Sequence, residues 1–244
     1  MTDTDVLIVG GGVAGLSAAI YTARADMETL VVDADESILE RNAHLENFPG
    51  FPAGVDARRF LSMTREQAEG AGARFREERV VDVVPHDEES GFTVELGAGE
   101  ELTADYVVAA SWSDAAYLED VEGVGLVQRG SKRFVDVDEH GFTGVAGLYA
   151  AGRIAEKHHQ AVVAAGHGAE VALAILEASD VPFYHDWVTP EGYFTGRGRE
   201  IPPGCEEIDD AEREERAAHS REVMREAFSE PYPDEPTMHP SVEE

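Results

Sequence analysis

The stretch VLIVGGGVAGLSAAIYTARADMETLVVDAD, residues 6–35, decides the fold of this chain. Its first four residues form an uninterrupted apolar run, as expected of a strand buried on both faces. Residues 14–24 are mostly small or apolar and contain no proline, so a helix follows. Residues 30–32 predict a second buried strand that ends at Asp33. Strand, glycine loop, helix and strand in this order indicate an α/β fold with a parallel sheet.

The loop between the first strand and the helix carries a dinucleotide-binding pattern, because Gly10, Gly12 and Gly15 match G-x-G-x-x-G. These glycines allow a tight turn, a close approach of the backbone to a pyrophosphate and close packing of helix on strand. Asp33 follows Gly10 by about 20 residues, as the acid that binds a ribose does. The predicted contacts are Gly10, Gly12, Val13, Ala14, Gly15, Asp33 and Ala34. The pattern does not separate NAD from FAD, and a glycine-rich turn without a ligand is the alternative.

The charge of the chain limits its partners. Its 244 residues carry 19 Lys and Arg against 50 Asp and Glu, for a formal net charge of −31. Such a field repels nucleic acid and anionic membranes, so we expect neither as a partner. A surface rich in carboxylates suits a cell interior full of salt, where repulsion is screened within about 3 Å at 1 M. We interpret it as a halophilic surface.

Cysteine content and hydropathy limit the class of protein further. Cys205 is the only cysteine of the chain, which excludes an intrachain disulfide and a Cys-x-x-Cys redox pair. No apolar run approaches the ~20 residues of a membrane span, and the first residues do not resemble a signal peptide. We therefore expect a cytoplasmic protein without a membrane anchor.

The remaining patterns extend the α/β reading. Short strands expected at residues 80–84, 92–96 and 101–103 form an antiparallel meander. Further elements are a helix at 57–70, buried strands at 106–110 and 147–151, and a helix at 161–178. Residues 181–204 then form an irregular, proline-rich arm with aromatic anchors, followed by a charged helix at 208–228. From Pro231 onward, repeated prolines predict an ending without order.

Three further blocks give the chain a family resemblance. They are HLENFPGFP at residues 44–52, FVDVDEHGFTGVAGLYAAG at 134–152, and HHQA at 158–161. With the opening GGGVAGLSAAIYTARA, they resemble the low-molecular-weight thioredoxin reductase-like flavoproteins. The resemblance implies a Rossmann-like, three-layer FAD-binding domain of parallel sheet, helices and antiparallel β-meander, followed here by a C-terminal extension. It also implies FAD as cofactor, a homodimer, and an NADPH domain inserted into the FAD domain.

The inserted domain has no counterpart in the sequence. Only about residues 111–132 stand where the family carries its NADPH domain, and even one βαβ unit needs about 30 residues. We expect an FAD-binding domain at residues 1–180, made of segments 1–111 and 133–180 joined by a short linker. An arm, an acidic helix and a tail follow at 181–244. Because the chain has no pair of cysteines that could pass electrons on, this departure from the family pattern argues against thioredoxin reduction.

The resemblance adds candidate contacts to the flavin half of the cofactor, which are Asn47, Gly152, Arg153, His159, Gln160 and Ala161. Asn47 either contacts the flavin edge or caps the turn before Pro49. Gln160 either begins a helix whose positive end stabilises the reduced flavin or is an ordinary polar N-terminal residue. Arg153 stands where the family has an aspartate that holds a ribityl hydroxyl. It cannot accept that hydrogen bond, although it can bind a phosphate. The family's Ala-Thr-Gly is replaced by Ala109-Ala110-Ser111.

Other residues with reactive side chains carry weaker signals. His158 and His159 are adjacent on the chain and would point about 100° apart on a helix, which argues against a shared metal. His159 remains open as an acid or base. His167 and Glu170 suggest a structural pair. Cys205 is either a spare thiol or a group near the flavin.

The aromatic residues of the arm are Trp187, Tyr193 and Phe194. They either cover the flavin face left bare by the missing domain or pack the arm or a dimer.

Two classes of function follow from these observations. The leading one is an FAD-dependent oxidoreductase that takes electrons from an external donor, either NAD(P)H or another protein, with no side chain assigned as a catalyst. The alternative is a non-catalytic FAD- or nucleotide-binding module that acts as a sensor, scaffold or subunit. Direct NAD binding on the first loop is a third possibility, which the blocks around Asn47 and Gln160 argue against.

Overall fold

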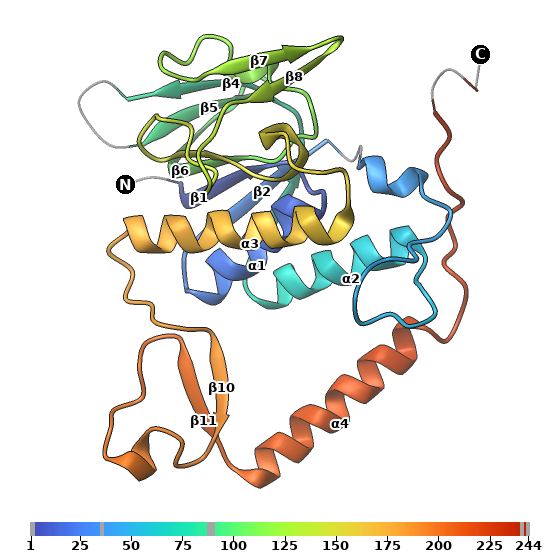
Figure 1. Ribbon diagram of the computed structural model, residues 1–244, viewed down its shortest axis with the longest axis vertical. Helices are drawn as coiled ribbons and strands as arrows, with labels where there is room; N and C mark the ends of the chain where they lie inside the picture. The colour runs from blue at the N-terminus through green and yellow to red at the C-terminus, as the bar shows by residue number, and fades with distance from the viewer. Residues whose placement is uncertain (1–2, 35–36, 87–90, 240–241, 243–244) are drawn as a thin grey trace.

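A computed structural model describes residues 3–34, 37–86, 91–239 and 242 (Figure 1). Its centre is a seven-stranded sheet in the order β3-β2-β1-β6-β5-β4, with β9 beside β6. The parallel strands are β1 (Thr4–Val9), β2 (Thr29–Asp33), β3 (Arg74–Glu77), β6 (Glu101–Ala109) and β9 (Leu148–Ala150). The antiparallel strands are β4 (Val80–Pro85) and β5 (Phe92–Leu96). The predicted α/β class is therefore confirmed.

Strand β1 explains the apolar run that opens the sequence. Val6 and Ile8 belong to the core between the sheet and the helices, whereas Leu7 and Val9 belong to the core on the opposite face. Because both faces of the sheet are covered, all four side chains are buried.

Strand β6 joins the parallel sheet to the meander. Its residue Ala104 pairs with Thr4 of β1 on one side and with Phe92 of β5 on the other. The two strands expected at 101–103 and 106–110 are thus one strand of nine residues. Ala104 is fully buried and paired on both sides, so the chain does not turn there.

Three helices cover one face of the sheet (Figure 1). They are α1 (Val13–Arg24), α2 (Ala57–Gly70) and α3 (Ala161–Ala178). A Cβ atom at Gly168 of α3 would lie 2.1 Å from the carbonyl oxygen of Ala14, so this glycine lets α3 cross α1 at close range. Among the described helices α3 alone is apolar and long enough to span a membrane, but its packing on α1 and its buried residues are those of a core helix.

On the opposite face, the sheet continues through β6 into the meander strands β5 and β4, which pack back over Leu7 and Val9. A hairpin of β7 (Leu126–Arg129) and β8 (Lys132–Val135) lies on the same side (Figure 1). Short 3-10 helices lie at η1 (Ile38–Arg41), η2 (Ala116–Leu118) and η3 (Gly152–Ala155). Leu118, Phe134 and Leu148 are fully buried between these elements and the sheet. The layers are therefore helices, sheet, and meander with hairpin.

The C-terminal extension stands below the helical layer in Figure 1. Its arm contains the parallel strands β10 (Trp187–Pro190) and β11 (Cys205–Ile208) and the turn η4 (Thr195–Arg197). Helix α4 (Asp210–Ala227) follows, and its residues 210–226 are all exposed.

The tail beyond α4 returns to the body of the protein, although its prolines predicted an ending without order. Residues 228–239 form no helix or strand, yet Arg59 of α2 lies against the rings of Phe228 and Tyr232. Contacts supplied by a distant helix give this segment its place, which composition alone could not indicate.

Candidate functional site

A cavity of about 920 Å³ lies at the carboxyl ends of β1, β2 and β6. This edge of a parallel sheet is where α/β folds bind their ligands. The wall combines the first loop, the end of β2, η1, the residues after β6 and the start of α3. Its size is within the range of ligand pockets, ~300–1,000 Å³.

The first helix directs its N-terminus into this cavity. Gly12 is the N-cap of α1 and has no side-chain capping partner among the described residues. Gly12, Val13 and Ala14 line the cavity, so the uncapped N–H groups of the first turn are available to an anion. Among the residues that the structure describes, a Cβ atom at Gly12 would meet the Ser37 hydroxyl alone, at 3.9 Å, which leaves room in front of the loop.

The other two glycines of the pattern shape the loop itself. Gly10 has φ +111°, a conformation that favours glycine. A Cβ atom at Gly15 would lie 2.0 Å from the Gly10 carbonyl oxygen, so Gly15 sits behind the wall and permits the turn to close. Asp33 lines the cavity at the end of β2, where a Cβ atom at Gly11 would lie 2.4 Å from its carboxylate. The carboxylate therefore rests directly against the loop, as the ribose-binding interpretation requires.

Another part of the cavity wall is formed by residues from two blocks that are distant in the sequence. The side-chain amide of Asn47 donates to Oε1 of Gln160 at 2.7 Å, and both residues line the cavity. Gln160 is the N-cap of α3, where the described side chains again provide no cap. Two helix N-termini therefore face one cavity, which favours an elongated, negatively charged ligand.

Arg153 lines the cavity but is already engaged. Its guanidinium lies 4.8 Å from the ring centroid of Phe134 and donates to the Lys157 carbonyl at 3.0 Å. Gly152 lies behind the wall with φ +76°, where a Cβ atom would be 2.6 Å from the Cβ of Ala14.

A buried histidine holds the backbone of Gly152. The backbone N–H of Gly152 donates to Nδ1 of His167 at 2.9 Å. Because Nδ1 accepts this bond, the proton of the neutral ring resides on Nε2. Burial lowers the pKa of His167 to about 4, with a smaller contribution from Lys157. Nε2 is buried without a partner in the described part of the chain. The expected His167–Glu170 pair is wrong, because Glu170 instead approaches Nδ1 of His140 at 3.8 Å.

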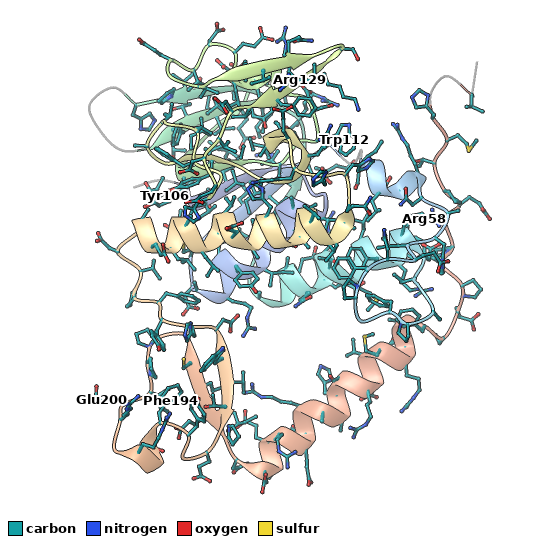
Figure 2. The ribbon with its side chains drawn as sticks, viewed as in Figure 1. Arg58, Tyr106, Trp112, Arg129, Phe194 and Glu200 are labelled. Atoms are coloured by element: carbon teal, nitrogen blue, oxygen red, sulfur yellow. The ribbon has the colours of Figure 1, made fainter. Side chains whose placement is uncertain are left out.

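Trp112 is a lining residue that the sequence did not reveal. Its φ of +61° is rare for a bulky side chain, and its ring lies 4.4 Å from that of His159 and 5.3 Å from Nζ of Lys132 (Figure 2). Burial lowers the pKa of His159, and the charges of Arg153 and Lys132 lower it further. Both effects favour the neutral form of the His159 ring.

The cavity brings together all the predicted contacts except Gly15 and Gly152, which support it from behind. Sequence reasoning missed much of the wall, namely η1, Asn42, residues 78–80, Trp112, Asp114, Tyr117, Thr237 and Met238. The only signal in the sequence for these residues was their place directly after predicted parallel strands, because residues that follow neighbouring parallel strands meet at one edge of the sheet.

The arm lies apart from the cavity. Phe194 is buried within the arm against Tyr193, at a ring distance of 4.9 Å, and Trp187 contacts Tyr193 at 6.3 Å (Figure 2). Cys205 donates weakly to the His185 carbonyl at 3.4 Å. Within one chain these groups pack the arm, rather than cover the cavity.

Comparisons with known proteins agree with this geometry. Residues 5–40 match the family described as FAD binding domain, and residues 52–168 match Pyridine nucleotide-disulphide oxidoreductase. The thioredoxin reductase of Aquifex aeolicus is 36% identical over 110 residues, which are 44% of this chain and 33% of that protein. The chain is related to the thioredoxin reductase-like FAD oxidoreductases.

Further relatives give the same result. The thioredoxin reductase of Treponema pallidum is 35% identical over 117 residues, 46% of this chain and 36% of that protein. The solved thioredoxin reductase from Gloeobacter violaceus superposes with a TM-score of 0.64 at 20% identity, over 76% of this chain and 100% of that chain. This structural similarity shows that the two chains share a fold. The matched region spans about a third of the length of the curated relatives.

The cofactor of this thioredoxin reductase-like chain is FAD. The residues present fit it. An uncapped helix end stands beside the glycine loop for the pyrophosphate, the Asp33 carboxylate is placed for a ribose, and the cavity continues to a second helix end at Gln160.

Proposed function

We propose that this chain is an FAD-binding flavoprotein that passes electrons from an external donor through its flavin and does not reduce thioredoxin. The observation that carries the proposal is the connection from β6 to β9. Within the described residues it contains only η2 and the β7–β8 hairpin, and the single cysteine of the chain, Cys205, belongs to the arm. In this proposal residues 1–111 and 133–180 form one FAD-binding unit, and residues 181–244 form an appendage.

The protein supplies binding, orientation and electrostatics. The first turn of α1 holds the pyrophosphate, and Asp33 accepts hydrogen bonds from the ribose of the adenosine half. When bound, flavin supplies hydride and electron transfer. The N-terminus of α3, at Gln160 and Ala161, would stabilise negative charge on a bound reduced flavin. His159 offers a ring nitrogen that can accept a proton, and N–H groups of Arg153 can bind a phosphate.

The donor is either NAD(P)H or another protein, since the cavity reaches the surface at Trp112 and His158. A homodimer, a cytoplasmic location and a halophilic habit remain predictions.

A non-catalytic FAD-binding module is the second candidate. The conformation of Arg153 favours it, because the guanidinium is engaged with Phe134 and the Lys157 carbonyl. An arginine also cannot accept the hydrogen bond of a ribityl hydroxyl.

The purified protein, kept in high salt, tests both candidates. Its visible spectrum and the identity of the released cofactor are measured first, and a band near ~450 nm is expected of bound flavin. NADH, NADPH and dithionite are then added without oxygen. Bleaching by a nicotinamide within seconds supports the oxidoreductase. If dithionite alone bleaches the flavin, and a reduced cell extract does not bleach it catalytically, the result supports the non-catalytic FAD-binding module. A colourless protein that added FAD does not stabilise overturns both.

A further inference from the structure

The C-terminal tail reaches the cavity. After α4 the chain runs beside α2 and η1, as Figure 1 shows, and Thr237 and Met238 line the cavity wall. We propose that this tail, residues 228–238, is part of the cofactor site and encloses the adenosine half of FAD.

The first anchor of the tail is Arg59 of α2. Its guanidinium lies 5.6 Å from the ring centroids of both Phe228 and Tyr232. Its Nη2 atom donates to the carbonyl of Glu230, between them, at 2.5 Å. Phe228 also approaches the ring of Phe51 at 6.4 Å. The start of the tail is therefore held by Arg59 and Phe51, residues that are not among those lining the cavity.

The second anchor is η1. The backbone N–H of Thr237 donates to the carbonyl of Glu40 at 3.3 Å. The same carbonyl accepts from Nη1 of Arg58 at 3.0 Å, and Nη1 also bonds the Asn42 carbonyl at 3.1 Å (Figure 2). Arg58 is only 7% exposed and is paired with Asp56. A buried, paired cation thus fixes the turn on which the end of the tail rests.

The position of η1 identifies which half of the cofactor the tail covers. η1 follows β2, whose last residue Asp33 is placed for the adenosine ribose. In the proposed function the flavin half lies against Asn47 and Gln160, which also line the cavity. The tail therefore meets the adenosine, not the flavin.

The chemistry of the tail suits this role. Met238 is 55% exposed, and its thioether is a flexible group that adapts to a flat aromatic ring such as adenine. Pro231, Pro233 and Pro236 restrict the unfolded tail to extended conformations, so it loses less freedom when it docks.

Two variants test the proposal, with ADP and FAD as probes. One ends the chain after Ser229, and the other is Arg59→Ala in the full chain. We expect each to weaken ADP binding and to speed FAD release about tenfold. The melting temperature of the cofactor-free protein should stay unchanged, because the tail packs on an exposed surface. Combining both changes should weaken ADP binding and speed FAD release no more than either change alone, since Arg59 acts through the tail.

Matched controls make the result specific. Arg65→Ala removes another arginine of α2, one that stacks on Phe75 at 4.4 Å and pairs with Glu69 at 3.1 Å, and it should leave ADP binding unchanged. Gln160→Ala should weaken FAD binding but not ADP binding. If the truncated chain binds ADP and FAD as tightly as the full chain, the tail proposal is wrong and the cofactor assignment stands. A full chain that binds neither ligand overturns both.

Discussion

Asn47 donates a hydrogen bond to Oε1 of Gln160, 113 residues away in the sequence, at 2.7 Å. This bond links the loop before α2 to the N-cap residue of α3. It brings together, at the cavity wall, two sequence blocks whose proximity no local pattern could show. The flavin half of the site is thus a tertiary feature, built by distant segments.

Replacing Asn47 by Ala should weaken FAD binding about 3- to 10-fold, because a neutral hydrogen bond contributes about 0.5–1.5 kcal/mol. ADP should bind as before, since it lacks the flavin half. Titrations with both ligands check this. In a double-mutant cycle with Gln160→Ala, the two losses should not add; fully additive losses would show that the bond has no part in binding.

Stability should fall below about pH 6.5 because of His167. Its pKa is near 6.5 in the unfolded chain and about 4 in the folded one. Between these values the unfolded state binds a proton that the native state does not, so stability is full above pH 6.5 and declines as pH falls toward 4. The loss should approach ~2–3 kcal/mol.

Thermal melting of the wild type and of His167→Asn, from pH 4 to 8 in high salt, measures this effect. An asparagine can still accept from the Gly152 N–H, so it isolates the titration. The melting temperature of the variant should vary less with pH in this window. Identical pH profiles for the two proteins would rule out the assignment.

FAD binding should quench the fluorescence of one tryptophan and spare the other. The chain has two, Trp112 at the cavity and Trp187 in the arm. Trp112→Phe should remove most of the quenching that FAD causes, and Trp187→Phe should retain it. The reverse pattern would place the cofactor near the arm.

High salt should stabilise the fold. A net charge of −31 favours expansion, and its repulsion extends about 10 Å at 0.1 M salt but only about 3 Å at 1 M. The melting temperature should therefore rise steadily between 0.1 and 2 M KCl. A melting temperature independent of KCl would refute the halophilic interpretation.

Sequence alone predicted the elements that have strong periodicity. Helices α2 and α3 begin and end at the expected residues, and the buried strands around the first loop lie where apolar runs predict them. Strand β3, with the sequence RFRE, was missed because three of its four residues are charged and its place depends on pairing with β2. The same limit applies to the site. The glycine loop carries a local pattern, whereas Trp112, η1 and the tail reach the cavity only through the folding of distant segments.

The central claim is that the first turn of α1 holds the diphosphate of FAD, and the FAD affinity of Gly12→Asp tests it most directly. The new side chain has room, since within the described part of the chain a Cβ atom at this position meets the Ser37 hydroxyl alone, at 3.9 Å. Aspartate is also a good N-cap, so the cofactor-free protein should melt at the same or a higher temperature.

Gly15→Ala is the matched control, because its Cβ would lie 2.0 Å from the Gly10 carbonyl oxygen and should destabilise the fold itself. For Gly12→Asp, the carboxylate would occupy the helix end and repel the diphosphate. The account predicts at least about a 100-fold loss of FAD affinity in a stable protein. Unchanged FAD affinity in that variant would contradict it.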